Sequence, residues 1–391
     1  MKILMYLVAA GIFGLLQNLL AQPHTNPEIL RVPNGGIQPR LEIGPSGAIH
    51  LVYFKGNAMA GDVFYVKRDS KSESWSEPVK VNHLPNSVVA AGTIRGPQMA
   101  LGRGERVHVA WMGSGKVATP AQEEGKYPKH PMLYSRMSDD QESFEPERDL
   151  LTWTAGLDGG GTVAADRYGN VYVAWHGKPD DSSMNEYGRA VYVTHSEDDG
   201  RSFKRETQAN PRATGACGCC GMRGFADSSG RLHLLYRMAN EVNRDMGLLV
   251  SGDQRESFSL HEVSQWEIQA CPMSSAAFAE GPSGVLLATE TETRVEVRLL
   301  LSGSQKLKKQ PGIESGNRNG KHPSLSMNRQ GDTILVWSEG AGWKNGGSLK
   351  WELHDQTGQL LSSSNGEGLS VPEWSFASAA TRSDGSFVIV Y

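Results

Sequence analysis

The sequence has few cysteines and no run of like charge. It holds 4 cysteines among 391 residues, and its 39 Lys and Arg nearly balance 43 Asp and Glu, for a net charge of −4. Without a clustered basic face, nucleic acid is not expected as a partner. There is no low-complexity tract and no sustained heptad. The 45 glycines and 19 prolines suit a fold with many turns.

Long hydrophobic stretches are also absent, apart from one at the N-terminus. Lys2 is followed by the apolar residues 3–16, and Ala21 offers a small residue before a cleavage point at Gln22. This pattern predicts a secretory signal peptide over residues 1–21 and a single mature domain over residues 22–391. An uncleaved anchor is the alternative, although the stretch is short for a membrane span. We therefore expect a secreted or periplasmic protein with no membrane contact after cleavage.

What the sequence does contain is a short apolar hairpin that recurs seven times. Each copy has small or apolar residues, a polar turn and a Val/Ile/Leu-rich strand that mostly ends in Trp or Tyr. The copies cover residues 39–53, 97–111, 163–175, 224–236, 276–288, 323–337 and 377–391. They follow one another at intervals of about 50 to 65 residues, a period typical of solenoids, propellers and arrays. Because the unit is a β-hairpin, a β-propeller is favoured.

Further strands complete each repeat. A third strand is expected at residues 63–67, 132–136, 190–195, 247–251 and 295–301, and a fourth at residues 203–206. The sequence thus predicts an all-β propeller of four-stranded antiparallel blades. Seven blades are favoured, with residues 28–32 as an outer strand that closes the last blade. Six blades are the alternative.

A turn motif recurs in phase with the hairpins. Residues 196–203 fit the pattern Ser-x-Asp-x-Gly-x-x-aromatic, in which the Asp side chain bonds the backbone of its turn and Gly accepts positive φ. Degenerate copies lie at residues 137–144, where Asp139 and Phe144 are kept, and at 251–258 and 68–75. These turns resemble the Asp-box (BNR) repeats of the sialidase-like propeller superfamily, over nearly the whole mature chain. Such boxes are structural and indicate little about a reaction.

The resemblance implies sialidase chemistry, but the motifs for it are missing. A sialidase carries an arginine triad, a Tyr–Glu nucleophile pair and an Asp acid/base, and its first arginine leads directly into the first inner strand. Arg31 lies too far ahead of that strand, and Gln38 and Pro39 occupy the expected place. Arg95 has a better phase but belongs to the second module. We therefore expect a member of the superfamily that is not a sialidase.

All four cysteines enter two neighbouring hairpins. Cys217, Cys219 and Cys220 precede the fourth hairpin, and Cys271 precedes the fifth. These equivalent positions predict that the four lie together on the face where loops converge and ligands usually bind. Disulfides are one interpretation, although pairing within the first three would be strained. The alternatives are a thiolate site for copper or zinc, with nearby methionine thioethers, and redox-active thiols.

Other polar residues are expected on the same face. The candidates for ligand binding are Arg95, His176, Arg223, Arg237, Glu290 and His322. Two long loops could border this face. They carry the carboxylates Glu123, Glu124, Asp180, Asp181 and Glu186, and two of these could serve as the acid and the base in glycoside hydrolysis. The aromatic residues at the hairpin ends are interpreted as blade packing.

The leading hypothesis is a secreted propeller that binds or processes a carbohydrate at one mouth of its channel, without the sialidase arginine triad. The ligand would be a glycan or another small polar molecule. The alternatives are a non-catalytic propeller with a Cys/Met metal or redox site, and a purely structural interaction module. Whether the protein is an enzyme stays open at this point; an enzyme of this kind would be similar to a glycoside hydrolase.

Overall fold

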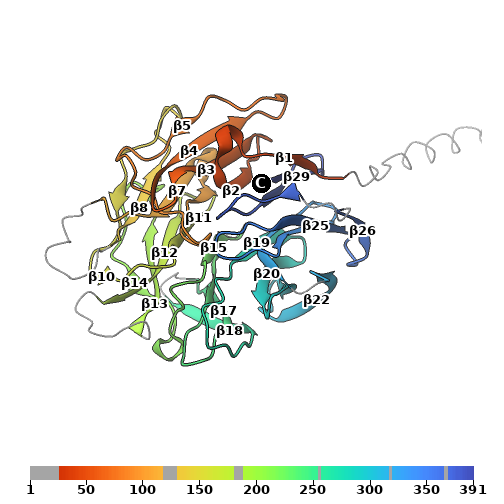
Figure 1. Cartoon of the computed structure of the whole chain (residues 1–391). Helices are drawn as coiled ribbons and strands as arrows, with labels where there is room; N and C mark the ends of the chain where they lie inside the picture. The colour runs from red at the N-terminus through yellow and green to blue at the C-terminus, as the bar shows by residue number, and fades with distance from the viewer. Residues whose placement is uncertain (1–25, 118–129, 180–187, 254–256, 317–318, 365–368) are drawn as a thin grey trace, which may run out of the picture.

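The described part of the chain forms seven β-sheets arranged around one axis, a seven-bladed propeller (Figure 1). The computed structural model describes residues 26–117, 130–179, 188–253, 257–316, 319–364 and 369–391. The all-β propeller and the favoured number of blades are confirmed, and each predicted hairpin forms the two inner strands of a blade. Within these residues there is no α-helix; short 3-10 turns occur at Pro33–Gly35, Arg103–Glu105 and Arg212–Thr214.

The first four blades follow the chain order. Blade 1 contains β2 (Ile37–Ile43), β3 (Ile49–Asn57), β4 (Ala60–Arg68) and β5 (Val79–Lys80), and blade 2 contains β6 (Gln98–Leu101), β7 (Val107–Met112), β8 (Met132–Arg136) and β9 (Arg148–Asp149). Blade 3 contains β10 (Thr154–Ala155), β11 (Gly161–Ala165), β12 (Val171–Pro179), β13 (Ala190–Ser196) and β14 (Thr207–Gln208). Blade 4 contains β15 (Arg223–Ala226), β16 (Leu232–Arg237), β17 (Met246–Ser251) and β18 (Phe258–Ser264).

The remaining blades complete the ring. Blade 5 contains β19 (Ala276–Gly281), β20 (Gly284–Thr291), β21 (Arg294–Leu301) and β22 (Leu307–Glu314). Blade 6 contains β23 (Gly320–Met327), β24 (Thr333–Glu339), β25 (Ser348–His354), β26 (Leu360–Ser363) and β27 (Leu369–Ser370). Blade 7 contains β28 (Ser378–Thr381), β29 (Phe387–Val390) and β1 (Glu28–Leu30).

The two ends of the described chain close the ring in blade 7. Strand β1 pairs in parallel with β29, so that Ile29 lies opposite Ile389, and Figure 1 shows the two side by side. The carboxylate of Glu28 accepts a hydrogen bond of 2.9 Å from Arg68 of blade 1 and a further bond from Arg382 of blade 7. The predicted outer strand from the N-terminal side is therefore confirmed, and blade 7 has three strands where four is the general number.

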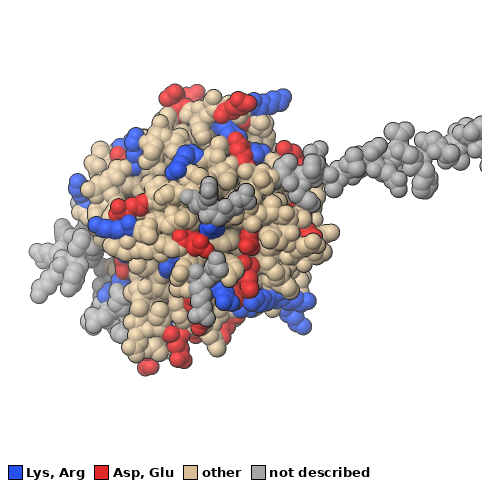
Figure 2. Space-filling model, turned by 45° about the vertical axis from the view of Figure 1, so that its right-hand side comes forward, with Lys and Arg blue, Asp and Glu red and all other residues tan. Residues whose placement is uncertain are grey.

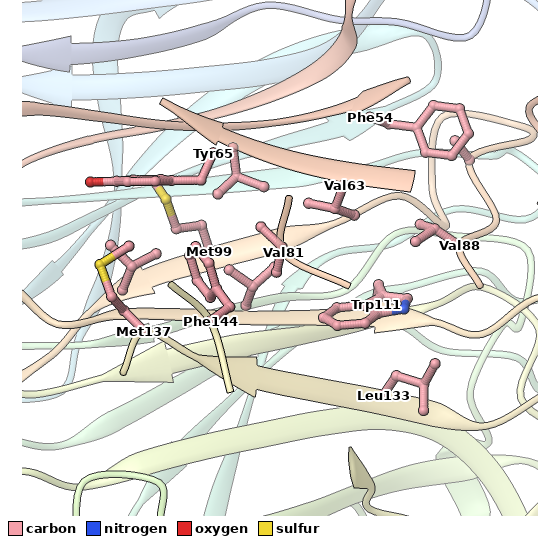
Figure 3. Packing of buried hydrophobic residues seen from close by; sticks show 14 of the residues in the cluster. Phe54, Val63, Tyr65, Val81, Val88, Met99, Trp111, Leu133, Met137 and Phe144 are labelled. Atoms are coloured by element: carbon pink, nitrogen blue, oxygen red, sulfur yellow. The ribbon is translucent and has the colours of Figure 1, made fainter. Parts of the chain in front are cut away.

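Hydrophobic residues of adjacent blades pack face to face. Figure 3 shows Val63 and Tyr65 of blade 1 packed in one cluster with Trp111 and Leu133 of blade 2. The second strand of each blade is buried on both faces because it lies between two neighbours, which explains its continuous Val/Ile/Leu character. The aromatic residues at the hairpin ends are buried, as expected for blade packing; they are Tyr53, Trp111, Trp175, Tyr236, Trp337 and Tyr391.

The Asp box of blade 3 has the expected geometry. Asp198 Oδ1 accepts a hydrogen bond of 2.8 Å from the Ser202 backbone N–H, and Gly200 has a φ of 77°. Phe203 packs edge-on against Tyr134 of blade 2, with ring centroids 4.8 Å apart. The box thus stabilises both its own turn and the contact between blade 3 and blade 2.

Two details of the sequence prediction are wrong. The fourth strand of blade 3 lies at Thr207–Gln208 and not at residues 203–206, which form the end of the Asp-box turn. In the degenerate box of blade 2, Asp140 and not Asp139 accepts from the turn, through the Glu142 N–H at 2.9 Å. Asp139 pairs instead with Arg201 of the neighbouring Asp box at 2.9 Å.

Candidate functional site

We call the face on which the chain enters the first strand of each blade the entry face. On this face, residues 88–96 lie across the end of the central channel. We call these residues the plug segment; they connect β5 of blade 1 to β6 of blade 2. Thr93 Oγ1 lies 3.2 Å from Nε2 of His322 in blade 6, and Arg95 Nη2 donates to Asp158 Oδ1 of the blade 3 entry loop at 2.6 Å. Because blades 6 and 3 lie on opposite sides of a seven-membered ring, residues so close in sequence can reach both only across its centre.

The plug segment is anchored on the side of blades 1 and 2. Val88 forms two backbone hydrogen bonds with Gly61 of β4, and its side chain joins the cluster between blades 1 and 2 near Trp111 (Figure 3). The Gln38 side chain donates to the carbonyl oxygens of Ala90 at 2.5 Å and of Trp374 at 2.7 Å. The segment is therefore a packed part of the fold and not a surface loop.

Three residues around this segment have left-handed backbone conformations. Gln38, Thr93 and His322 have φ values of 54°, 62° and 53°, which are uncommon for residues other than glycine. Gln38 and His322 also directly precede prolines at corresponding positions of blades 1 and 6, where a left-handed conformation is unusual. Such strain is often found at functional sites, where the surrounding structure holds it in place.

Two tryptophans lie beside the plug segment. Trp343, in the loop after β24, is 54% exposed, and its ring meets that of Trp374 edge-on, with centroids 6.1 Å apart. A Cβ atom built on Gly92 would lie 2.8 Å from the Trp343 ring and 2.9 Å from the Arg95 guanidinium. An exposed aromatic surface and the Arg95–Asp158 ion pair are therefore neighbours on the entry face.

A polar cluster is buried beneath the entry loops of blades 4 and 5. The Arg237 guanidinium is fully buried, donates to Ser274 Oγ at 3.0 Å and bonds the carbonyl oxygen of Glu290. Lys321 Nζ lies 3.0 Å from the Glu290 carboxylate. Burial raises the pKa of Glu290 to about 7, and the nearby cations only partly offset that shift. This cluster stabilises the loops and has no solvent-exposed carboxylate.

The cysteines are free, and Cys271 is exposed whereas Cys217 and Cys220 are buried. The sulfur atoms of Cys217 and Cys219 lie 3.4 Å apart. The two entry loops do meet, but through Ser274, whose Oγ lies 3.6 Å from Cys220 Sγ and whose carbonyl accepts from the Gly221 N–H. No group of three or more His, Cys, Asp or Glu among the described residues is arranged to hold a metal ion.

His176 and Arg223 lie apart from the exposed surface. His176 on β12 is fully buried, neither of its ring nitrogens has a hydrogen-bond partner among the residues that the structure describes, and burial lowers its pKa to about 4. Arg223 begins β15 and lines the central channel, a cavity of 370 Å³ bounded by the inner strands. The sequence-predicted residues therefore fall into three groups: Arg95 and His322 around the plug segment, a buried set (His176, Arg237, Glu290), and Arg223 in the channel.

Sequence reasoning missed the two tryptophans of the site, of which Trp343 is exposed and Trp374 is half-buried. Trp343 and Trp374 lie in loops without periodicity, although a tryptophan in the glycine-rich stretch 339–347 could have been noticed as lacking a packing role. Asp158 and the plug segment were missed as well, because contacts across the ring leave no local pattern. The loop carboxylates Glu123, Glu124, Asp180, Asp181 and Glu186 lie outside the described residues.

Charges of both signs are interspersed on the face shown in Figure 2, with wide uncharged areas between them. No helix among the described residues is long and apolar enough to cross a membrane.

No protein-family model matches the sequence, and no curated protein is significantly similar to it. Solved structures do share its fold. An α-L-arabinanase from Penicillium chrysogenum, complexed with arabinobiose, is 12% identical with a TM-score of 0.54, over 87% of this chain and 100% of that chain. An α-L-arabinofuranosidase from Fusarium graminearum is 11% identical with a TM-score of 0.53, over 85% and 97%. The NanB sialidase from Streptococcus pneumoniae is 13% identical with a TM-score of 0.44, over 95% and 68%. The arabinanase and the arabinofuranosidase thus share the fold of this chain, a propeller as the repeated hairpins predicted.

Proposed function

We propose that this sialidase-like propeller binds a carbohydrate on its entry face, on the surface formed by Trp343, Trp374, Arg95 and Asp158. The observation that carries the proposal is the 54% exposure of Trp343 beside a paired arginine and carboxylate. Trp343 and the adjoining Trp374 form a contiguous apolar surface rimmed by polar groups, and such surfaces mark binding sites.

The chemistry of these side chains suits a sugar. The exposed Trp343 ring offers a flat apolar face on which the C–H face of a sugar ring can stack, and the half-buried Trp374 ring supports it edge-on. The Arg95 and Asp158 side chains offer donors and acceptors for hydroxyl groups, and their ion pair holds them in fixed positions. The arabinanase with a similar fold was solved with arabinobiose, which supports a carbohydrate ligand by analogy of fold alone.

We propose binding and not hydrolysis. Among the described residues, the carboxyl group whose pKa lies near neutrality is that of Glu290, and it is fully buried and paired with Lys321, so it cannot contact a ligand on the surface. A general acid must lie within hydrogen-bond reach of the atom that it protonates. We also propose that the protein acts outside the cytoplasm, in line with the signal-peptide pattern of residues 1–21, which lie outside the described residues.

A panel of neutral and acidic glycans tests this proposal by calorimetry, with Trp343→Ala as the variant. We expect the variant to weaken binding about tenfold, which corresponds to about 1.4 kcal/mol. Tyr168→Ala is the matched control, because Tyr168 is 52% exposed in the β11–β12 turn at the opposite face. Release of reducing sugar should stay at background. Equal affinity of Trp343→Ala and wild type, or no glycan bound at all, would contradict the proposal.

A second candidate function is a thiol centre, favoured by the 3.4 Å contact between the sulfur atoms of Cys217 and Cys219. Neighbouring cysteines can bind copper or zinc as thiolates or undergo reversible oxidation. Metal analysis and thiol counting on the purified protein, with and without a mild reductant, test it. Stoichiometric copper or zinc that is lost in Cys219→Ser would support a metal site, whereas four cysteines that hold no metal and stay oxidised under the reductant would remove this candidate.

A further inference from the structure

Two arginines face each other in the central channel. Arg40 on β2 of blade 1 and Arg223 on β15 of blade 4 both line the cavity of 370 Å³. Both are half-buried in the wall of this cavity, and burial together with the positive charge of Arg223 lowers the pKa of Arg40. Like charges in one cavity destabilise the fold where no negative group offsets them.

The protein offsets these charges in part, because the carboxylates Glu42 and Glu280 also line the cavity. Among the described residues, the Arg40 guanidinium makes no hydrogen bond and no ion pair; its Nε is buried without a partner, and the group lies over the Phe376 ring at 4.4 Å. Arg223 donates to the neutral side chain of Gln98 at 3.1 Å. Glu42 is the carboxylate that acts on Arg223, but it already accepts from the Leu101 N–H at 3.0 Å, and burial raises its pKa.

The channel is accessible from one side. The plug segment covers the axis on the entry face, whereas the lining of the cavity continues to Ile43, Leu101 and Thr381, at the far ends of their inner strands. A cavity of this volume accommodates a small anion or an acidic monosaccharide, with the arginines in its wall.

We propose that the central channel binds a small oxyanion, a sulfate or carboxylate group, between Arg40 and Arg223. The planar guanidinium groups match the paired oxygen atoms of such groups. The unpaired Nε of Arg40 would gain an acceptor, and the repulsion between the two cations would be relieved. This site is distinct from the carbohydrate surface proposed above, since it lies inside the ring, beyond the plug segment.

Thermal unfolding and calorimetry with sulfate, glucuronate and glucose test this inference. We expect sulfate and glucuronate to bind and to raise the unfolding temperature, and glucose to do neither. Binding by glucuronate alone would assign the site to a sugar-borne carboxylate, and binding by both would assign it to oxyanions in general. Arg40→Gln and Arg223→Gln should each weaken binding by about tenfold or more, because each removes a charge-assisted contact.

The variants also report on the fold. Without added anion, Arg40→Gln should unfold at a temperature equal to or above that of wild type, because the substitution removes the repulsion. Arg294→Gln on the outer strand β21 of blade 5 serves as a control and should bind the anions as wild type does. Equal stabilisation of wild type and both channel variants by sulfate, or no stabilisation by either anion, would overturn the inference.

Discussion

His176 is a buried imidazole that stays neutral because burial lowers its pKa to about 4. In the unfolded chain its pKa is about 6.5, so the unfolded state binds more protons between these two values. The contribution of His176 to the free energy of unfolding is therefore present near neutral pH and is lost as the pH falls from about 6.5 to about 4, by up to about 3 kcal/mol.

We expect His176→Gln to remove this loss. From about pH 7 to about pH 4.5, the free energy of unfolding of the variant should fall by about 2 to 3 kcal/mol less than that of wild type. Urea denaturation at both pH values measures this change. Glu290→Gln is an informative comparison with the opposite sign, because the raised pKa of Glu290 costs stability as the pH rises from about 4.5 to about 7. An unchanged pH dependence in His176→Gln would contradict the assignment of a neutral imidazole.

The Cys217–Cys219 contact gives a second prediction at this scale. With an added mild oxidant, a disulfide should form within Cys217, Cys219 and Cys220 before any that involves Cys271, because the Cys217 and Cys219 sulfur atoms are 3.4 Å apart and Cys220 interacts with both. Peptide mass spectrometry would detect the loss of two hydrogens within one fragment. Cys271→Ser should leave the reaction unchanged, since Cys271 is exposed and the sulfur contact among the described residues does not involve it. Cross-linking through Cys271 would contradict this prediction.

Among the secondary-structure elements, the inner hairpins and the third strands β4, β8, β13, β17 and β21 follow from the sequence, whereas several of the fourth strands do not. The inner strands alternate or run apolar and end in polar turns, so residues 163–175 alone define β11 and β12. The outer strands β5, β9 and β14 have two residues each, too short to carry any periodicity. The same reason explains the site: Trp343, Trp374 and the plug segment belong to connections, whose paths depend on partners far away in the chain.

The connection into blade 3 shows how one residue stabilises such a path. Glu206 is 2% exposed, and its Oε1 accepts hydrogen bonds from the backbone N–H groups of Thr152, Trp153 and Thr154 at 2.9, 3.1 and 3.2 Å. We expect Glu206→Ala to lower the free energy of unfolding by about 2 to 4 kcal/mol, because buried donors are left unpaired. Chemical denaturation measures this loss.

Glu197→Ala is the matched control for that experiment. Glu197 is exposed and pairs with Lys204, also exposed, so its removal should change the free energy of unfolding by less than about 0.5 kcal/mol. Similar losses for the two variants would show that the backbone contacts of Glu206 contribute little.

At the scale of the whole molecule, ring closure depends on β1. Deletion of residues 1–31 removes the third strand of blade 7 and the Glu28 contacts with blades 1 and 7, so that β29 becomes an open edge. We expect this deletion to lower the free energy of unfolding by about 3 kcal/mol or more and to promote aggregation.

The comparison is a chain that lacks only residues 1–25, which should unfold like the mature protein. Calorimetric unfolding and light scattering of both truncated chains distinguish the two cases. Equal unfolding temperatures would mean that the ring is held closed by the packing of blades 7 and 1 alone.

The plug segment has one more consequence, for polymers. A propeller whose central channel is open at both ends could let a linear polymer pass through it, and could slide along that polymer. Here the plug segment, residues 88–96, closes the central channel at the entry face. A molecule can therefore enter only from the other face, and only as far as the plug segment. A polysaccharide must therefore lie across the outside of the protein or offer it only a chain end or a side branch.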